Sequence, residues 1–190
     1  FSIDTRAAEQ VPGVERVLTA ADIPGDKMTG LITPDMPVLC DELVRRQGDP
    51  IAIVAAESDT IARRACGMID VAYELLPVIS DPRQAMLPGS HRLHPEGNII
   101  SELHIENGDV DEIFGNAALV FEHEYSTGRQ EHAHIETESG AAYYDDDGRL
   151  TVRFGGQHPH WDQEIISKIL GIDRNEVRII SPMMGGSFGG

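Results

Sequence analysis

The sequence predicts an α+β protein whose two halves are organised differently. Residues 1–96 alternate short strands with short helices, the pattern of helices that pack against small sheets. Residues 86–98 are rich in proline, glycine and histidine, have no periodicity and are typical of a linker. From residue 97 onward the pattern is mainly that of strands, with one amphipathic helix near the end.

The composition excludes several classes of protein. With 41% hydrophobic residues, a chain of 190 residues is expected to fold around a sizeable core. The formal net charge is −17, which disfavours nucleic acid as a partner, because binding to phosphate needs clustered lysine and arginine. No apolar run approaches the ~20 residues that a membrane-spanning helix needs.

The two cysteines, Cys40 and Cys66, form no C-x-x-C motif, so neither a disulfide framework nor an iron–sulfur motif is expected. A reducing, cytoplasmic location follows. Because the chain begins without methionine and ends inside a glycine-rich loop, it is expected to be an internal piece of a larger protein.

The first half is predicted to form a strand at Glu15–Leu18, a second at Ile51–Ala56 and a third at Val71–Glu74. The second run is almost wholly apolar, which predicts burial on both faces. A helix is expected between the second and third strands. The order strand, helix, strand then predicts a right-handed crossover with the helix packed on the sheet.

Ser58 is a good N-cap for that helix. Apolar residues recur at helical spacing on one face and include Ile61, Ala65, Met68 and Ile69. Cys66 lies among them and is expected to be buried, whereas Arg63 and Arg64 are expected to face solvent.

In the second half, alternating residues predict strands at 99–105 and 118–125. Between them, Asp109 is expected to cap a short helix through Phe114. The segments 141–144 and 150–154 are predicted to form a hairpin around the turn Asp145–Gly148.

The last part of the chain predicts a helix at His160–Leu170 that ends at Gly171 in the C′ position. Asp173 is then expected to cap a further short turn before a strand at Val177–Ile180. The glycine-rich loop follows this strand directly.

The loop Gly185–Gly190 is the leading candidate for a ligand site. Glycine allows positive φ and close approach, and backbone N–H groups in such a loop are suited to an anionic oxygen of a cofactor. A glycine cluster alone is just as often a plain turn. Gln157, however, follows another strand end, and two strand ends with ligand-ready groups commonly form a cleft. The loop has neither the G-K-[ST] of a phosphate loop nor the G-x-G-x-x-G spacing of a dinucleotide site.

His132, His134, Glu136 and Glu138 stand at every second position. On a strand, this spacing places their side chains on one face. Such a row is compatible with a metal site, but an edge strand with satisfied polar groups is the preferred interpretation. His158 and His160 flank a proline and are interpreted as structural. No nucleophile or isolated acid–base pair emerges from the spacing.

An ordered set of motifs nevertheless resembles a known family. The motifs are Ile3–Thr5, Pro12–Val14, Val17–Thr19, Asp22–Pro24, Arg46–Pro50, Ile51–Ala56, Val71–Pro77, Glu131–Glu136, Gly156–Gln157 and Gly185–Gly190. Together they resemble the large, molybdopterin-binding subunit of the molybdenum hydroxylases, the xanthine dehydrogenase and aldehyde oxidase family. The resemblance implies an α/β hammerhead domain over 1–96, lacking its first strand, and the start of a molybdopterin-binding α/β domain over 97–190.

The resemblance also implies the chemistry. Members of the family insert oxygen from water into a C–H bond of a heterocycle or aldehyde, and pass the electrons to iron–sulfur clusters and often FAD in partner domains or subunits. By resemblance, Gln157 hydrogen-bonds an oxygen ligand of molybdenum. Gly185, Gly186, Phe188 and Gly189 hold the cofactor through their backbone. No catalytic residue or metal ligand is implied within the chain, because the general base is expected beyond Gly190.

Two positions depart from the family pattern: Ser187 replaces a third consecutive glycine, and Thr137 replaces a proline. The resemblance favours a purine such as xanthine or hypoxanthine as substrate and a homo-oligomeric full enzyme. An aldehyde, a nicotinate-like heterocycle or carbon monoxide stays open. So do a non-catalytic docking module and a small metal-binding protein. The 190 residues alone are expected neither to catalyse a reaction nor to hold molybdopterin tightly.

Overall fold

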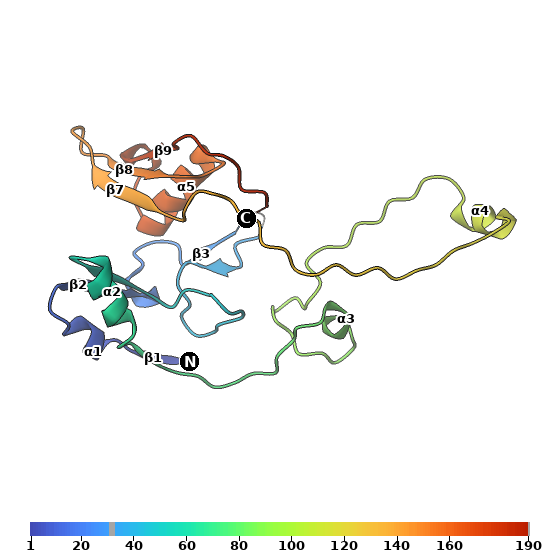
Figure 1. Cartoon of the computed structure of the whole chain (residues 1–190), viewed down its shortest axis with the longest axis horizontal. Coiled ribbons are helices and arrows are strands. Elements are labelled where there is room, and N and C mark those ends of the chain that lie inside the picture. Colours follow the sequence, from blue (N-terminus) through green and yellow to red (C-terminus); the bar gives the residue numbers. More distant parts are fainter. Residues whose placement is uncertain (31–32, 190) are drawn as a thin grey trace. The chain divides into compact units, whose positions relative to one another are not determined.

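The computed structural model describes residues 1–30 and 33–189, and these residues divide into two compact units (Figure 1). One unit consists of Phe1–Leu75 together with the residues from Ala133 onward, and the other is Leu76–His132. Each is described by itself. Gly190, which belongs to the predicted glycine-rich loop, lies outside the described residues.

The first unit contains most of the helices and strands. In chain order its elements are β1 (Ser2–Asp4), α1 (Arg6–Glu9), β2 (Val14–Thr19), the 3-10 turn η1 (Ala20–Asp22), β3 (Met28–Thr29), β4 (Met36–Pro37), β5 (Ala52–Ala56), α2 (Asp59–Cys66), β6 (Asp70–Ala72), β7 (Gly140–Tyr144), β8 (Leu150–Phe154), α5 (Pro159–Leu170), the 3-10 turn η2 (Arg174–Glu176) and β9 (Val177–Ile180). The second unit contains α3 (Pro82–Ala85) and α4 (Val110–Asn116).

The amino-terminal part is built from short antiparallel pairs. Strand β2 pairs with β5, with Val17 opposite Val54, and a register shift between Val14 and Arg16 bends the pair. Strand β1 pairs with β6, and β3 with β4. Helices α1 and α2 cover the β2–β5 pair through a small core that contains Ala8, Val17 and Ala65. The fold class is therefore α+β, as predicted.

The sheet arrangement differs from the prediction for β5 and β6. A right-handed crossover requires these strands to share a sheet, but β5 pairs with β2 whereas β6 pairs with β1. The prediction was wrong because β5 and β6 each form an antiparallel pair with a different strand from the start of the chain. Burial of β5 on both faces was also wrong: its residues alternate, and Ile53 is 51% exposed, because the helices cover one face only.

The cysteine prediction was wrong as well. Cys66 is exposed and Cys40 is the buried cysteine. In α2 the fully buried position is Ala65, and the next residue along a helix points about 100° away from it, so Cys66 faces outward. Burial raises the pKa of the Cys40 thiol above its usual value.

The carboxyl-terminal part of the first unit follows the predicted order. Strands β7 and β8 form an antiparallel hairpin around the turn Asp145–Gly148, and β9 pairs with β8 in parallel. Helix α5 makes the crossover between β8 and β9, which parallel neighbours require. It ends at Gly171, whose left-handed φ of 65° confirms the predicted C′ residue.

In the second unit, Asp109 caps α4 as predicted: its side chain accepts a hydrogen bond from the backbone N–H of Glu112. The strands expected at 99–105 and 118–125 are absent there. A strand needs a neighbour for its N–H and C=O groups, and within the described residues neither segment has one. Their apolar side chains remain exposed, completely so at Ile100.

Within residues 1–30 and 33–189, no helix is long and apolar enough to cross a membrane.

Replacing the cap of α2 tests its contribution to stability. The Ser58 side chain accepts from the backbone N–H of Ile61 at 3.4 Å, a long hydrogen bond. Ser58→Ala is therefore expected to lower the free energy of unfolding by about 0.5 to 1 kcal/mol, the lower part of the range for helix caps. Ser58→Asp, which keeps an acceptor, is the matched control in denaturant titrations. Equal stability of Ser58→Ala and the unaltered protein would contradict a role for the cap.

Candidate functional site

The carboxyl ends of β8 and β9 form one edge of a sheet, and two segments meet there. Because the strands are parallel, the segment after β8 and the loop after β9 leave the sheet on the same side. The Gln157 side-chain N–H donates to the Ser187 hydroxyl at 2.8 Å, and the Ser181 hydroxyl donates to the carbonyl of Gly156 at 3.2 Å. The structure thus brings together Gln157 and the glycine-rich loop, as the sequence predicted.

The loop backbone is held in an unusual conformation. Gly186 and Gly189 have φ values of 123° and 98°, and Phe188 has a φ of 56°. A left-handed conformation costs a non-glycine residue about 1–2 kcal/mol, and such strain is concentrated at functional sites. The Phe188 ring is 74% exposed.

The amide groups of this loop are available as donors. Within residues 1–30 and 33–189, the backbone N–H groups of Gly186, Ser187, Phe188 and Gly189 donate to no protein acceptor. Gln157 adds a further donor, because its side-chain NH₂ has two hydrogens and Ser187 accepts only one. The sheet edge therefore presents a set of neutral N–H donors, which come from Gln157 and from the backbone of the loop.

Glu136 fixes the start of the loop. Its carboxylate accepts a hydrogen bond from the backbone N–H of Gly185, 49 residues along the chain, and this bond lowers the pKa of the Glu136 carboxyl below its usual value. A Cβ at position 185 would lie 2.9 Å from the same carboxylate. Because the amide of Gly185 is used within the protein, Gly185 contributes to the site through its lack of a side chain.

The turn before Gln157 also depends on a glycine. A Cβ at Gly156 would lie 2.5 Å from Oδ2 of Asp162 and 3.0 Å from the Phe154 ring. Asp162 lies in the first turn of α5, and burial raises the pKa of its carboxyl. Its Oδ2 is buried and has no hydrogen-bond partner in the described part of the chain.

The histidine row is not on a strand, so the expectation that His132 and His134 share a face was wrong. Ala133 between them has a φ of 54°, which is incompatible with an extended strand. His134 instead makes local contacts: Nδ1 lies 2.8 Å from the carbonyl oxygen of Glu136, and Nε2 lies 3.7 Å from the Glu138 carboxylate. The described residues contain no group of three or more histidine, cysteine, aspartate or glutamate side chains placed to hold a metal ion.

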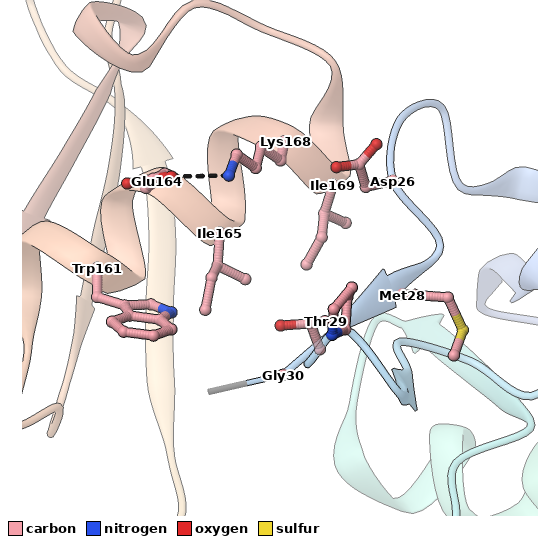
Figure 2. Close-up of a pocket in the computed structure, with 10 residues that line it drawn as sticks. Asp26, Met28, Thr29, Gly30, Trp161, Glu164, Ile165, Lys168 and Ile169 are labelled. Carbon is pink, nitrogen blue, oxygen red and sulfur yellow. Dashed lines mark hydrogen bonds and ion pairs between the residues drawn. The ribbon is translucent and has the colours of Figure 1, made fainter. Parts of the chain in front are cut away.

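A groove runs along the exposed side of α5. A cavity of about 280 Å³ lies between α5 and β3, and Figure 2 shows Trp161, Ile165 and Ile169 projecting from the helix into it. An ion pair between Glu164 and Lys168, 2.7 Å apart, lies on the same helix. A second hollow of about 490 Å³ is lined by Gln157, and it shares Trp161 and Glu164 with the first. The two hollows are therefore neighbours on α5, and the second one reaches Gln157.

Comparison with known proteins identifies this arrangement. Residues 1–77 match the model of the aldehyde oxidase and xanthine dehydrogenase a/b hammerhead domain, and residues 93–190 match that of the molybdopterin cofactor-binding domain. The chain belongs to the molybdenum hydroxylase family. Both domains predicted from the sequence are thereby confirmed, whereas their boundary at residues 96 and 97 stays a prediction.

Individual members of the molybdenum hydroxylase family are similar over the whole chain. A probable xanthine dehydrogenase subunit from Bacillus subtilis is 44% identical over 100% of this chain and 25% of its own length. The nicotinate dehydrogenase large molybdopterin subunit of Eubacterium barkeri is 40% identical over 100% of this chain and 44% of its own. The solved aldehyde oxidoreductase of Desulfovibrio gigas is 30% identical, with a TM-score of 0.83, over 98% of this chain and 22% of its own. The chain thus spans between 22% and 44% of the length of these relatives.

The sheet edge fits a molybdopterin-type cofactor. Such a group presents anionic and oxo oxygens, for which N–H donors are the matching partners, and it brings its own sulfur ligands, so no protein ligand to the metal is needed. Gln157, Gly186, Phe188 and Gly189 supply donors or open backbone at this edge. Their assignment as cofactor contacts stays a prediction.

Sequence reasoning missed three participants in the site. Ser187 was noticed only as a departure from glycine, yet its hydroxyl orients Gln157. Glu136 was weighed as a possible metal ligand, whereas it anchors Gly185. Asp162 was not predicted to take part in the site. The two glycines at 155 and 156 could have indicated a side chain packed closely against the end of β8.

Acidification tests the anchor at Glu136. A lowered pKa in the folded protein means that the hydrogen bond contributes fully above the ordinary value of 4.5 and is lost as the pH falls through the folded value. Protection of the Gly185 amide, normalised to the intrinsic exchange rate at each pH, is expected to be constant near neutrality and to fall under these acidic conditions. Glu136→Gln is expected to weaken it near neutrality and to remove its pH dependence, because a neutral acceptor bonds less strongly.

Glu138→Gln is the matched control, since Glu138 is an exposed carboxylate on the same segment and does not contact the loop. Unchanged protection in Glu136→Gln would contradict the anchoring role.

Proposed function

We propose that the full-length protein is a molybdenum hydroxylase that oxidises a purine-like heterocycle, such as xanthine or hypoxanthine, with water as the source of oxygen. The observation that carries the proposal is the meeting of Gln157 with a loop of free amides at one sheet edge of a chain in this family. The purine is favoured because the relative from Bacillus subtilis carries the name of a xanthine dehydrogenase subunit.

The residues at the edge bind and orient the cofactor. When bound, the cofactor supplies a two-electron oxidation in which oxygen from one water replaces hydrogen on a substrate carbon, releasing two protons and two electrons. The second amide hydrogen of Gln157 would donate to an oxygen of the cofactor, while the first stays on Ser187. The backbone N–H groups of Gly186, Phe188 and Gly189 would donate to further oxygens, and Glu136 holds the start of the loop.

The remaining parts of the enzyme belong to regions that the relatives have in addition to this chain. We assign the proton-accepting base to such a region, and iron–sulfur clusters and FAD, which receive the two electrons, to partner domains or subunits. The full enzyme is expected to be a cytoplasmic homo-oligomer.

We infer that the two hollows beside α5 form the route of the substrate. Trp161 lines both hollows and Gln157 lines the second, so a molecule that moves from the first to the second meets an indole before it reaches Gln157. Trp161 is 39% exposed, which leaves part of its ring free to stack on a planar heterocycle.

An aldehyde is the second candidate substrate. The apolar side chains that line the first cavity, Ile165 and Ile169 among them, also suit an uncharged aldehyde, and the aldehyde oxidoreductase of Desulfovibrio gigas shares this fold.

Expression of the full-length protein tests the activity. It is expected to contain about one molybdenum per chain and to oxidise hypoxanthine with incorporation of oxygen from H₂¹⁸O. Nicotinate and a small aldehyde are assayed beside it. Turnover of the aldehyde alone would select the second candidate, and absence of molybdenum from a folded full-length protein would overturn the proposal. The 190-residue piece, treated identically, is the control and is expected to retain no molybdenum.

Trp161→Ala tests the route of the substrate. Loss of stacking is expected to raise KM for the heterocycle about tenfold, which corresponds to 1.4 kcal/mol, with a smaller effect on a small aliphatic aldehyde. Trp161→Phe retains a ring and is the matched control in steady-state kinetics. Equal KM values for the heterocycle in all three proteins would show that the substrate does not pass Trp161.

A further inference from the structure

The carboxyl-terminal end of α5 is bonded by a segment from the start of the chain. Its own cap is complete: Gly171 N–H donates to the carbonyl of Lys168 at 3.2 Å, and Ile172 N–H donates to that of Ser167 at 3.1 Å. In addition, Gly25 N–H donates to the carbonyl of Ile169 at 2.9 Å and Asp26 N–H to that of Lys168 at 2.9 Å. Figure 2 shows Asp26 beside this end of the helix. The segment Gly25–Asp26 therefore clamps the last turn of α5.

Only glycine fits at position 25. A Cβ there would overlap the carbonyl oxygen of Lys168 and would lie 2.8 Å from the Gly171 nitrogen and 2.9 Å from the Ile169 oxygen. All three are backbone atoms, so no side-chain rotation relieves the overlap. Gly25 does not have a positive φ, in contrast to Gly171. Glycine is therefore needed at position 25 because a side chain would not fit against the helix, and not because of the backbone conformation.

The other end of the same helix carries the cofactor edge. Helix α5 begins at Pro159, two residues after Gln157, and the Gly156 turn packs under Asp162 in the first helical turn. One residue after Asp162, the Gln163 side chain donates to the carbonyl of Val177 at 2.7 Å and thereby fastens the helix to β9. This attachment lies between the first turn of the helix and Ile169.

We propose that Gly25 is a positioning residue for Gln157, acting through α5. The hammerhead segment fixes where the last turn of the helix lies, the attachment at Gln163 serves as the pivot, and the first turn sets the location of the Gln157 amide. The role assigned to Gln157 rests on the proposed function, whereas the mechanical link between the two ends of α5 does not.

The test uses the full-length protein and two glycine variants. Gly25→Ala introduces the overlap with α5. Gly48→Ala is the matched control: Gly48 belongs to the same part of the chain, and its φ of 95° makes alanine there strained, but a Cβ would meet nothing within 4 Å. The control thus adds backbone strain without overlap with α5. Asp26→Pro removes one clamping N–H without adding a Cβ at position 25, and it replaces Gly25→Ala if that variant fails to fold.

The first readout is hydrogen exchange, which requires neither cofactor nor turnover. Gly25→Ala is expected to speed exchange at 169–172 and also in the first turn, at the Asp162 amide, which bonds to the carbonyl of His158. Gly48→Ala is expected to leave both unchanged. Faster exchange at 169–172 alone would mean that the contact is a local support, and it would overturn the positioning role.

The second readout is a double-mutant cycle in the molybdenum-loaded enzyme. Gly25→Ala is expected to lower kcat about tenfold, with KM changed less, since small misplacements of a site cost one to two orders of magnitude. In a Gln157→Ala background, Gly25→Ala is expected to have little further effect on kcat. An equal effect of Gly25→Ala in both backgrounds would overturn the proposal. An unaltered protein without molybdenum would instead refute the proposed function and leave the exchange result valid.

Discussion

The parallel ladder between β8 and β9 is the interaction on which the site depends. It pairs Leu150 with Val177 and continues to Arg153 opposite Ile180, so two loops that are thirty residues apart leave the sheet at the same edge. A slip of one residue would displace one loop by about 3.3 Å and turn each side chain to the opposite face. The 2.8 Å contact between Gln157 and Ser187 does not survive such a shift. Thr151, fully buried on β8, bonds to Asp145 and so ties the hairpin to the same register.

The glycine-rich loop is held by contacts that oppose a strained backbone. The left-handed Phe188 costs about 1–2 kcal/mol. Two hydrogen bonds, from Gly185 to Glu136 and from Gln157 to Ser187, act against this cost. The free amides of the loop are kept in place by side chains from two other segments rather than by the loop itself.

The predictions that proved correct are mostly those that depend on residues close together in the sequence. Ser58, Asp109 and Gly171 act within a turn of their helices, and these caps were predicted correctly. The joint edge of Gln157 and the loop also followed, because parallel strands leave little freedom in topology. Predictions failed where packing against other parts of the chain determines the structure. These were the burial of β5 and of Cys66, the strands at 99–105 and 118–125, and the arrangement of His132 and His134. Glu136 lies 49 residues from Gly185, and no sequence pattern joins them.

The chain has a negative net charge, whereas the sheet edge at Gln157 presents hydrogen-bond donors. The formal net charge is −17, yet the sheet edge at Gln157 presents N–H groups. Asp162 lies in the first turn of α5, where an ionised carboxylate would neutralise the positive end of the helix. Burial raises the pKa of Asp162, so its charged form is disfavoured beside Gly156 and Gln157. The same linkage makes ionisation of Asp162 destabilising as the pH rises. The fold thus keeps a carboxyl whose ionisation is disfavoured close to the donors of the edge.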